Sequence, residues 1–378
     1  MKRLALFLCI FLLCGCSAAP AETVPSVTAA ETLETAALPT EATLPPDPIR
    51  DMLDEMSLEE RVGQLFLARC DDSIALEHIQ QYHLGGFVLF GRDFDGETPE
   101  SFRDKIDDYQ ASAKIPLLLA VDEEGGTVSR ISSNRTFYPD TLPSPRDSYA
   151  WKGLEGCLIV EEAKCQLLQD LGLNVNLGPV CDISTDRAAF MYQRSLGQDP
   201  DITSQFVNST VMLMDAYYIG SCLKHFPGYG NNPDTHTGIA VDTRALDELE
   251  SSDLLPFAAG IQADCGAILV SHTIVEAMDK ELPASLSPEV HQYLRDTMHF
   301  EGVILTDDLV MQAITDLYGA GEAAVMAVLA GNDLLCSTEY MVQYEAVLAA
   351  VLDGRIDIDV LNSAVRNVLE WKQDLGLL

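Results

Sequence analysis

The sequence predicts one α/β domain built as a (β/α)8 barrel of the TIM type. Eight short apolar runs alternate with helix-like stretches, which is the pattern of a parallel sheet. The runs are almost continuously apolar, as expected for strands buried on both faces. The expected strands are Gly63–Leu67, Gly86–Phe90, Leu117–Asp122, Asn174–Val180, Gly220–Lys224, Ala267–Ser271, Gly302–Asp307 and Asn332–Leu335.

Polar side chains at strand ends favour a closed barrel over a doubly wound open sheet, which is the alternative. Asp122, Lys224, His272 and Asp307 each fall at or just after the carboxyl end of an expected strand. Groups from so many strands converge on one pocket most easily when the sheet closes. We therefore expect a pocket at that end of the barrel.

Helices are expected before, between and after the strands. One begins at Ser57, which has the N-cap position of a capping box with Glu60 at N3. The others are expected at Ile74–His83, Pro99–Ala113, Gly153–Leu171, Ile202–Tyr218, Ala245–Gln262, Pro288–Met298, Gly321–Ala330, Tyr340–Leu352 and Asp359–Leu375.

The amino-terminal residues predict an export signal rather than a part of the fold. Two basic residues precede the apolar run Leu4–Leu13, which is too short to span a bilayer. The sequence Cys14-Gly15-Cys16 then looks like a lipobox. We expect residues 1–15 to be a lipoprotein signal peptide and Cys16 to carry the lipid, with an ordinary secretory signal as the alternative.

Residues 16–47 predict a disordered tether, because they are mostly Ala, Thr, Glu and Pro and contain no aromatic residue. Residues 48–378 are left for the folded domain. The formal net charge of −36 argues against nucleic acid and anionic lipid head groups as partners. We therefore expect an exported protein, lipid-anchored through Cys16 to the outer face of a bacterial membrane, at the cell surface or in the periplasm.

Cysteine usage indicates neither a disulfide framework nor a metal site. Seven cysteines follow Cys16, an odd number that excludes complete pairing within the chain. Several lie in apolar runs and are expected to be buried as small hydrophobic side chains. We expect no metal, no cofactor and a monomer.

The strand Gly302–Asp307 ends on two acids, Asp307 and Asp308. Side chains alternate along a strand, so one of the two can point inward, and the residues themselves do not decide which. Capping of the next helix by both is the alternative.

The segment Ser221–Asp242 contains the other residue types that acid–base and nucleophilic chemistry need. Lys224 and His225 end an apolar strand, and a buried lysine requires a partner, either a substrate or the acids after the seventh strand. A structural ion pair is the alternative. Beyond a Pro- and Gly-rich loop, Asp234 can orient the ring of His236 and hold its proton, although a polar surface turn fits the same pattern.

The run Val121–Gly126 places three acids after the third strand. It does not match a phosphate loop, and carboxylates suit a hydroxyl-rich ligand. Calcium binding and a solvated turn are the alternatives. Arg187 and Arg194 follow the fourth strand, and one of them can reach the same pocket.

Lys224-His225-Phe226-Pro227-Gly228 followed by Asp234-Thr235-His236 resembles the signature of glycoside hydrolase family 3, and most of all its β-N-acetylhexosaminidase branch. Further blocks occur in the family's order, at Met56–Leu65, Val121–Arg130, Asn174–Ile183, Arg194–Gly197 and Thr306–Leu309. The resemblance implies that residues 48–378 are a (β/α)8 catalytic domain. It also implies a retaining, exo-acting hydrolase that releases terminal β-linked N-acetylglucosamine from a carbohydrate substrate such as a wall fragment.

The resemblance also implies roles for single residues. Asp307 matches the catalytic nucleophile, His236 the acid/base, and Asp234 the residue that tunes His236. The residues that would hold the sugar are Asp122, Arg194, Lys224 and His225. Relatives in other branches have a second domain that can supply a glutamate acid/base; little sequence follows Trp371 here, so His236 is expected to do that work.

Two departures from the family pattern bear on the loop. Tyr229 stands where many relatives have a second histidine, and the stretch Gly230–Asp234 looks one residue shorter than the commonest form. Both affect the reach of the loop and the specificity for the leaving group.

Two other functions stay open. One is a metal-dependent barrel hydrolase using His225, His236, His272 and Asp307, although the usual His-x-His after the first strand is missing. The other is a sugar- or muropeptide-binding lipoprotein without turnover.

Overall fold

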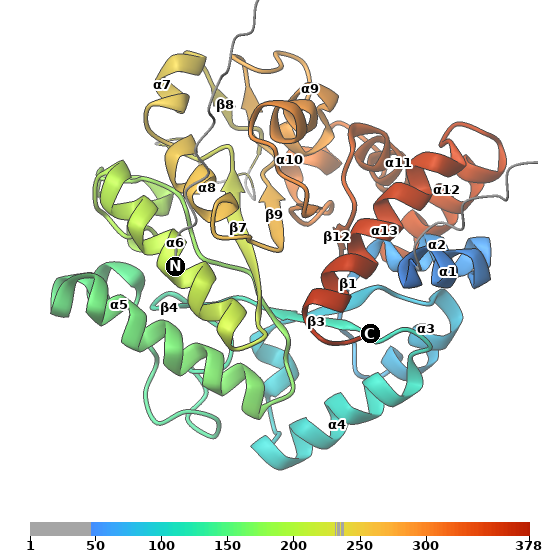
Figure 1. The fold of residues 1–378 in the computed structure, drawn as a ribbon, viewed down its shortest axis with the longest axis horizontal. Coiled ribbons are helices and arrows are strands. Elements are labelled where there is room, and N and C mark those ends of the chain that lie inside the picture. Colours follow the sequence, from blue (N-terminus) through green and yellow to red (C-terminus); the bar gives the residue numbers. More distant parts are fainter. Residues whose placement is uncertain (1–46, 231, 233–234, 236–237) are drawn as a thin grey trace, which may run out of the picture. The chain divides into compact units, whose positions relative to one another are not determined.

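Eight parallel strands form a nearly closed barrel with helices around its outside (Figure 1). The structure is a computed structural model that describes residues 47–230, 232, 235 and 238–378. Asp47–Leu378 make one compact unit. The barrel strands are β1 Phe66–Arg69, β2 Gly86–Leu89, β3 Leu118–Val121, β6 Val175–Asn176, β7 Gly220–Phe226, β9 Ala267–Val270, β11 Val303–Thr306 and β12 Leu335–Ser337.

The strand order follows the chain around the barrel, from β1 through β11, and β12 pairs back onto β1 with Phe66 opposite Leu335. Between β11 and β12 the sheet continues as a single bridge, Leu305 to Leu334, with Thr306 N donating to Leu334 O at 3.1 Å. The order never reverses as it does in a doubly wound sheet. The predicted barrel is therefore confirmed as a nearly closed parallel barrel.

The helices mostly follow the expected pattern. They are α1 Pro48–Glu55, α2 Leu58–Gln64, α3 Ala75–Tyr82, α4 Pro99–Ser112, α5 Pro145–Asp170, α6 Pro200–Ala216, α7 Leu246–Glu250, α8 Leu254–Ile261, α9 Pro288–Gln292, α10 Gln312–Thr315, α11 Ala320–Ala330, α12 Tyr340–Leu352 and α13 Ile358–Asp374. Two small ladders pair residues outside the barrel, β4 Glu123–Gly125 with β5 Val128–Ser129, and β8 Val241–Asp242 with β10 Ile274–Val275.

The first strand begins at Phe66 and not at the predicted Gly63, because α2 continues through Gln64. The capping box that starts α2 is present, with Ser57 accepting from Glu60 N and the Glu60 side chain accepting from Ser57 N. The apolar run therefore divides between a buried helix end and a strand, which periodicity alone cannot separate.

The predicted helix Ala245–Gln262 is two helices, α7 and α8. Pro256 lies in the first turn of α8, where its missing N–H is harmless, but its ring would clash with a helical carbonyl four residues earlier. A continuous helix is therefore interrupted just before Leu254. Helices α1 and α10 were not predicted.

The barrel interior is filled with side chains from alternate strand positions, among them Leu67, Val88, Leu118 and Leu305. Trp371 of α13 joins this cluster and closes the end at which the strands begin. A Cβ atom on Gly266, before β9, would lie 2.0 Å from Trp371 Nε1, so the indole packs where only glycine leaves room. The open end of the barrel is therefore the one at which the strands finish.

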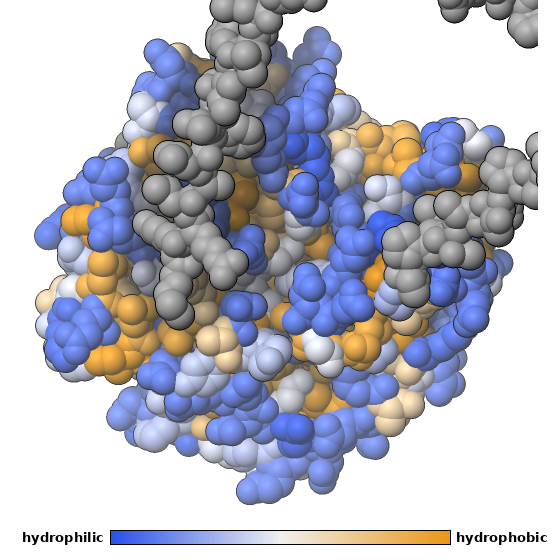
Figure 2. Space-filling model, in the orientation of Figure 1, coloured by the Kyte–Doolittle hydropathy of each residue, from blue (hydrophilic) through white to orange (hydrophobic). Residues whose placement is uncertain are grey.

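Hydrophilic residues cover much of the face drawn in Figure 2, with smaller hydrophobic patches between them. The seven cysteines that the structure describes are free and buried, as expected. Within the described part of the chain, no helix has both the length and the apolarity required to cross a bilayer.

Candidate active site

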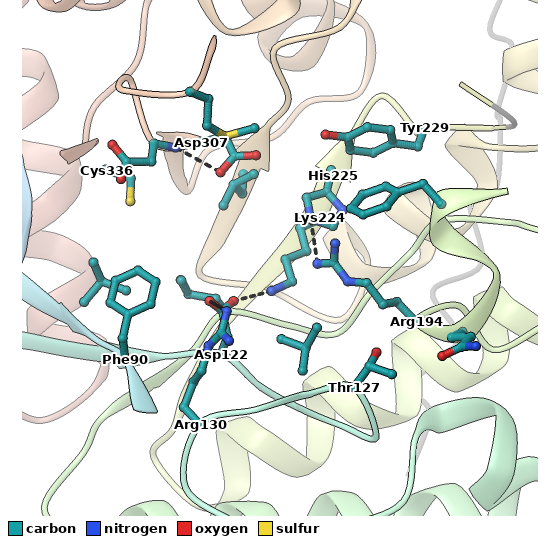
Figure 3. Close-up of a pocket in the computed structure, with 18 of the residues that line it drawn as sticks. Phe90, Asp122, Thr127, Arg130, Arg194, Lys224, His225, Tyr229, Asp307 and Cys336 are labelled. Atoms are coloured by element: carbon teal, nitrogen blue, oxygen red, sulfur yellow. Dashed lines mark hydrogen bonds and ion pairs between the residues drawn. The ribbon is translucent and has the colours of Figure 1, made fainter. Parts of the chain in front are cut away.

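A pocket of about 1070 Å³ lies where the barrel strands end (Figure 3). Five sequence-predicted residues line it: Asp122, Arg194, Lys224, His225 and Asp307. Arg187 lines it as well, so both arginines after the fourth strand reach the pocket. The other three predicted site residues, Cys16, Asp234 and His236, lie outside the described residues.

Lys224 is buried and its ammonium group contacts two carboxylates. Its Nζ lies 2.6 Å from Asp122 Oδ1 and 2.7 Å from Glu124 Oε1. Burial by itself lowers the pKa of Lys224, but the charges of Asp122 and Glu124 outweigh burial and raise the pKa above its ordinary value. Among the described residues, Lys224 therefore forms the structural ion pair that was the alternative, with acids at the end of the third strand and not with Asp307 or Asp308.

Glu124 is the centre of this network, and the sequence analysis did not single it out from its neighbours. Its carboxylate accepts from Arg194 Nε at 2.9 Å and from Arg194 Nη2 at 2.6 Å, besides its contact with Lys224. Burial raises the pKa of the Glu124 carboxyl, but the charges of Lys224 and Arg194 hold it well below its usual range. Glu124 is therefore a fixed anion between two cations.

The three acidic side chains of the run, Asp122, Glu123 and Glu124, have two different roles. Glu123 turns away from the pocket and accepts from Ile131 N at 2.8 Å and from Ser132 Oγ at 2.5 Å, which fixes the following loop. Asp122 lines the pocket and Glu124 is buried behind it, and both carboxylates contact the cations Lys224 and Arg194. Among the described residues, no group of three histidine, cysteine or acidic side chains is arranged to hold a metal ion.

His225 is held in one tautomer by its neighbours. Its Nε2 lies 3.0 Å from Arg194 Nη2, which can only donate, so Nε2 accepts. Its Nδ1 therefore carries the hydrogen and donates to Asp182 Oδ2 at 2.8 Å. Asp182 also accepts from the backbone N of His225 and of Tyr229, at 3.1 and 2.7 Å. Asp182 is a buried residue that the sequence analysis missed.

The two acids after β11 have different surroundings. Asp308 accepts from Thr338 Oγ1 at 2.6 Å and from Thr338 N at 3.2 Å, which ties the β11 loop to the β12 loop. Asp307 accepts, among the described residues, one hydrogen bond from Asp308 N at 2.9 Å. The Asp307 carboxylate therefore keeps most of its acceptor capacity free and faces the pocket (Figure 3).

Tyr229 lines the pocket beside this site and contacts Thr235. The ring is buried and packs edge-to-face on His225, with centroids 5.2 Å apart. Its hydroxyl lies 2.5 Å from Thr235 Oγ1, and Thr235 is fully buried. Thr235 stands between Asp234 and His236 in the sequence, so a described contact anchors the chain between two predicted site residues.

Comparison with known proteins gives a consistent result. The family model described as Glycosyl hydrolase family 3 N terminal domain matches residues 57–371. A protein of Stenotrophomonas maltophilia (strain K279a) named Beta-hexosaminidase is 32% identical over 308 residues, covering 78% of this chain and 88% of that relative.

Two solved structures are similar to the barrel. The glycoside hydrolase family 3 β-N-acetylglucosaminidase from Paenibacillus sp. str. FPU-7 superimposes with a TM-score of 0.79 at 30% identity, covering 85% of this chain and 63% of that chain. The β-N-acetylhexosaminidase from Beutenbergia cavernae DSM 12333 gives a TM-score of 0.76 at 26% identity, covering 84% of this chain and 99% of that chain. The chain thus spans less than two thirds of the Paenibacillus enzyme's length.

Proposed function

The chain belongs to glycoside hydrolase family 3 and is a glycosidase, and we propose that it releases terminal β-linked N-acetylhexosamine, chiefly N-acetylglucosamine. The observation that supports this most strongly is the arrangement of the pocket. A buried network of Asp122, Glu124, Lys224 and Arg194 lies across from the free carboxylate of Asp307. The network suits sugar hydroxyls, and the carboxylate suits the anomeric carbon.

Exo-acting cleavage is part of this proposal, and the closed bottom of the pocket supports it. Side chains fill the barrel interior beneath it, and Trp371 closes the far end. A sugar can therefore enter with its non-reducing end first, and a chain cannot pass through. Asp122 offers carboxylate acceptors, while Arg194 and Lys224 offer donors, so both hydrogen-bonding capacities of a hydroxyl group are met.

The proposed mechanism is a double displacement with retention of configuration. Asp307 attacks the anomeric carbon while the bond to the leaving oxygen breaks, which gives a covalent glycosyl-enzyme. His236 donates its proton to the leaving oxygen. In the second step His236 takes a proton from water, the water oxygen bonds to the anomeric carbon, and Asp307 is released.

The roles of Asp234 and His236 rest on the sequence resemblance. A histidine in this role contributes roughly 10²–10⁴-fold to the rate. An unperturbed imidazole titrates near neutral pH, so it can serve as acid and then as base without burial. Asp234 would favour the imidazolium and fix the ring's tautomer.

Two variants test this mechanism. Asp307→Ala should abolish turnover of 4-nitrophenyl N-acetyl-β-glucosaminide, and NMR of the wild-type reaction should show the β-anomer first. An α-anomer as first product would rule out double displacement.

His236→Ala should slow the hydrolysis of a substrate with a poor leaving group far more than that of the nitrophenyl substrate. Equal rates for wild type and variant on the substrate with the poor leaving group would remove His236 from the mechanism. Loss of wild-type activity in chelator would favour the metal-dependent alternative.

We further propose that the natural substrates are cell-wall fragments and that the enzyme is lipid-anchored at Cys16. The lipobox-like sequence before Cys16 supports the anchor. Incubation with purified muropeptides should release free N-acetylhexosamine, detected by mass spectrometry. Cys16→Ala should abolish incorporation of labelled palmitate and shift the protein from the membrane fraction; unchanged labelling would contradict the anchor.

A further inference from the structure

Arg244 forms a largely buried ion-pair cluster with Asp242 and Asp253, and the proposed mechanism does not use it. Its Nε donates to Asp242 Oδ1 at 3.1 Å and its Nη2 to Asp242 Oδ2 at 2.7 Å, a paired arrangement that matches the two carboxylate oxygens. Its Nη1 donates to Asp253 Oδ2 at 2.8 Å. The two acidic side chains are each 2% exposed, and none of the three residues lines the pocket. Any effect of this cluster on the reaction is therefore indirect.

The cluster contacts both ends of the predicted acid/base loop, residues 231–240. We call residues 228–230, where the chain enters this loop, and β8, where it returns, the loop neck. On the return side, Asp242 belongs to β8, which pairs with β10, and its carbonyl accepts from Glu276 N at 2.9 Å. The return side is therefore held by this ladder and, through the carboxylate of Asp242, by Arg244.

On the entering side, two glycines pack against the same cluster. Gly230 has a φ of +53°, and a Cβ atom there would lie 2.6 Å from Arg244 Nη2. Gly228 has a φ of +113°, and a Cβ atom there would lie 2.8 Å from Asp253 Oδ1. A side chain at either position would displace the cluster, so the guanidinium and the carboxylate contact the backbone itself.

One guanidinium thus contacts both sides of the loop neck, at Gly230 and at Asp242. Burial by itself lowers the pKa of Arg244, but its hydrogen bonds to Asp242 and Asp253 outweigh burial and raise the pKa above its ordinary value, so the guanidinium stays charged. Holding the two ends of a loop together restricts the conformations of the chain between them.

We propose that Arg244 is a positioning residue for the acid/base step, because it joins the two sides of the loop neck and so fixes the reach of His236 toward the leaving oxygen. Proton transfer needs a heavy-atom distance of roughly 2.6–3.2 Å, and a misplacement of about 1 Å can cost roughly a hundredfold in rate. An ion pair that only stabilises the fold is the alternative. This inference rests on the proposed function, since it takes His236 as the acid/base.

The experiment compares two leaving groups in wild type and Arg244→Gln. The substrates are methyl N-acetyl-β-glucosaminide, whose leaving group needs a proton, and 4-nitrophenyl N-acetyl-β-glucosaminide, whose leaving group needs little protonation. The measured quantity is kcat/KM, which reports the first displacement. Arg244→Gln should lower kcat/KM for the methyl substrate roughly tenfold to hundredfold. The loss on the nitrophenyl substrate should be several times smaller, and competitive inhibition by N-acetylglucosamine should be unchanged.

A matched arginine controls for lost stability. Arg295 is 28% exposed, against 24% for Arg244, pairs with the buried Asp333 at 2.6 Å and does not line the pocket. Arg295→Gln should lower the urea midpoint and keep the wild-type ratio of the two kcat/KM values. Arg244→Lys keeps the charge without the planar fork that spans both acids, and should give an intermediate ratio.

A glycine pair tests the same contact from the backbone side. Gly230→Ala would force the guanidinium of Arg244 away from the loop neck and should change the ratio in the same direction as Arg244→Gln. Gly354 also has positive φ, at +80°, but a Cβ atom there would meet nothing within 4 Å. Gly354→Ala should therefore keep the wild-type ratio.

A double-mutant cycle with His236→Ala separates this inference from the proposed function. If Arg244 acts through His236, the losses of Arg244→Gln and His236→Ala on the methyl substrate should not add. Additive losses, or equal losses of Arg244→Gln on both substrates, would overturn this inference and leave the proposed function standing. If His236→Ala itself lowered both substrates equally, the acid/base assignment would be wrong and this inference with it.

Discussion

Glu124 is the residue on which the charge balance of the pocket depends. Glu124→Gln would leave Lys224 with Asp122 as its carboxylate contact and would leave Arg194 with none among the described residues. Removing one partner of a buried ion pair costs roughly 3–5 kcal/mol. We therefore expect the urea midpoint to fall and the inhibition constant of N-acetylglucosamine to rise. Glu250→Gln, at an exposed acid that accepts from Tyr293, is the control, and equal midpoints for both variants would contradict the prediction.

Tyr229 stands where many relatives have a second histidine, and a substitution at this position tests how that difference affects the loop. Tyr229→Phe removes only the hydroxyl that contacts Thr235 Oγ1 at 2.5 Å. Because one hydrogen bond contributes about 0.5–1.5 kcal/mol, we expect kcat to fall roughly two- to tenfold on a substrate with a poor leaving group. The effect on a nitrophenyl substrate should be smaller, since that leaving group needs little protonation.

A double-mutant cycle separates positioning from general damage. If Tyr229 acts through Thr235, the effects of Tyr229→Phe and Thr235→Val should not add. Tyr293→Phe removes a hydroxyl that donates to Glu250 at 2.9 Å and should leave activity unchanged. Additive losses, or equal losses on both leaving groups, would show that Tyr229 does not position the loop.

Single site residues could be predicted from the sequence where they lay at the end of an expected strand. Asp307, Lys224 and Asp122 lie at the ends of expected strands, and motif blocks singled them out. Glu124 and Asp182 were missed because their importance comes from pairing with residues 70 and 43 positions away. Those pairs exist only once separate strands have closed into a barrel. The two glycines after Glu124, both with positive φ, are the one local sign of a tight turn that can aim its side chain inward.

At the scale of elements, α13 stabilises the barrel by closing the end at which its strands begin. Trp371 is 5% exposed and packs against Gly220 and Gly266. Trp371→Ala should cost roughly 3–5 kcal/mol of folding free energy, as large-to-small changes of buried aromatic residues do. Urea unfolding followed by circular dichroism measures this cost.

The other tryptophan provides a matched control. Trp151 is 65% exposed near the start of α5, so Trp151→Ala should change stability by no more than about 0.5 kcal/mol. A Trp371→Ala midpoint as close to wild type as that of Trp151→Ala would show that α13 does not close the barrel as described.

For the whole molecule, the alternation of apolar runs and helical stretches was enough to predict a barrel. All eight expected strands lie in it, because strands buried on both faces leave a clear signal. Their ends were less predictable: the first strand begins three residues later than expected, at Phe66, and the last lies over Leu335–Ser337 rather than Asn332–Leu335. Apolar residues next to a strand also serve helix ends and bridges, as at Val62 and Leu334, and only the packed fold decides between these uses.

The stability of the whole domain should depend on pH through one lysine that the sequence did not single out. Lys372 of α13 is fully buried, donates to Gln64 Oε1 at 2.6 Å, and forms no ion pair with a described residue. Burial lowers the pKa of Lys372 from 10.5 to about 7. Between these two values the unfolded chain holds a proton that the folded chain has released, so the free energy of unfolding rises with pH.

Below pH 7 the folded and the unfolded chain both hold this proton, and the increase in the free energy of unfolding is lost. We therefore expect the difference in unfolding free energy between wild type and Lys372→Met to change by about 1.4 kcal/mol per pH unit from pH 7 to 10, in favour of wild type. Urea unfolding at several pH values measures this difference, and the variant cancels the titration of all other groups. Parallel pH profiles would mean that Lys372 stays protonated in the fold, and that Gln64 solvates its charge as water would.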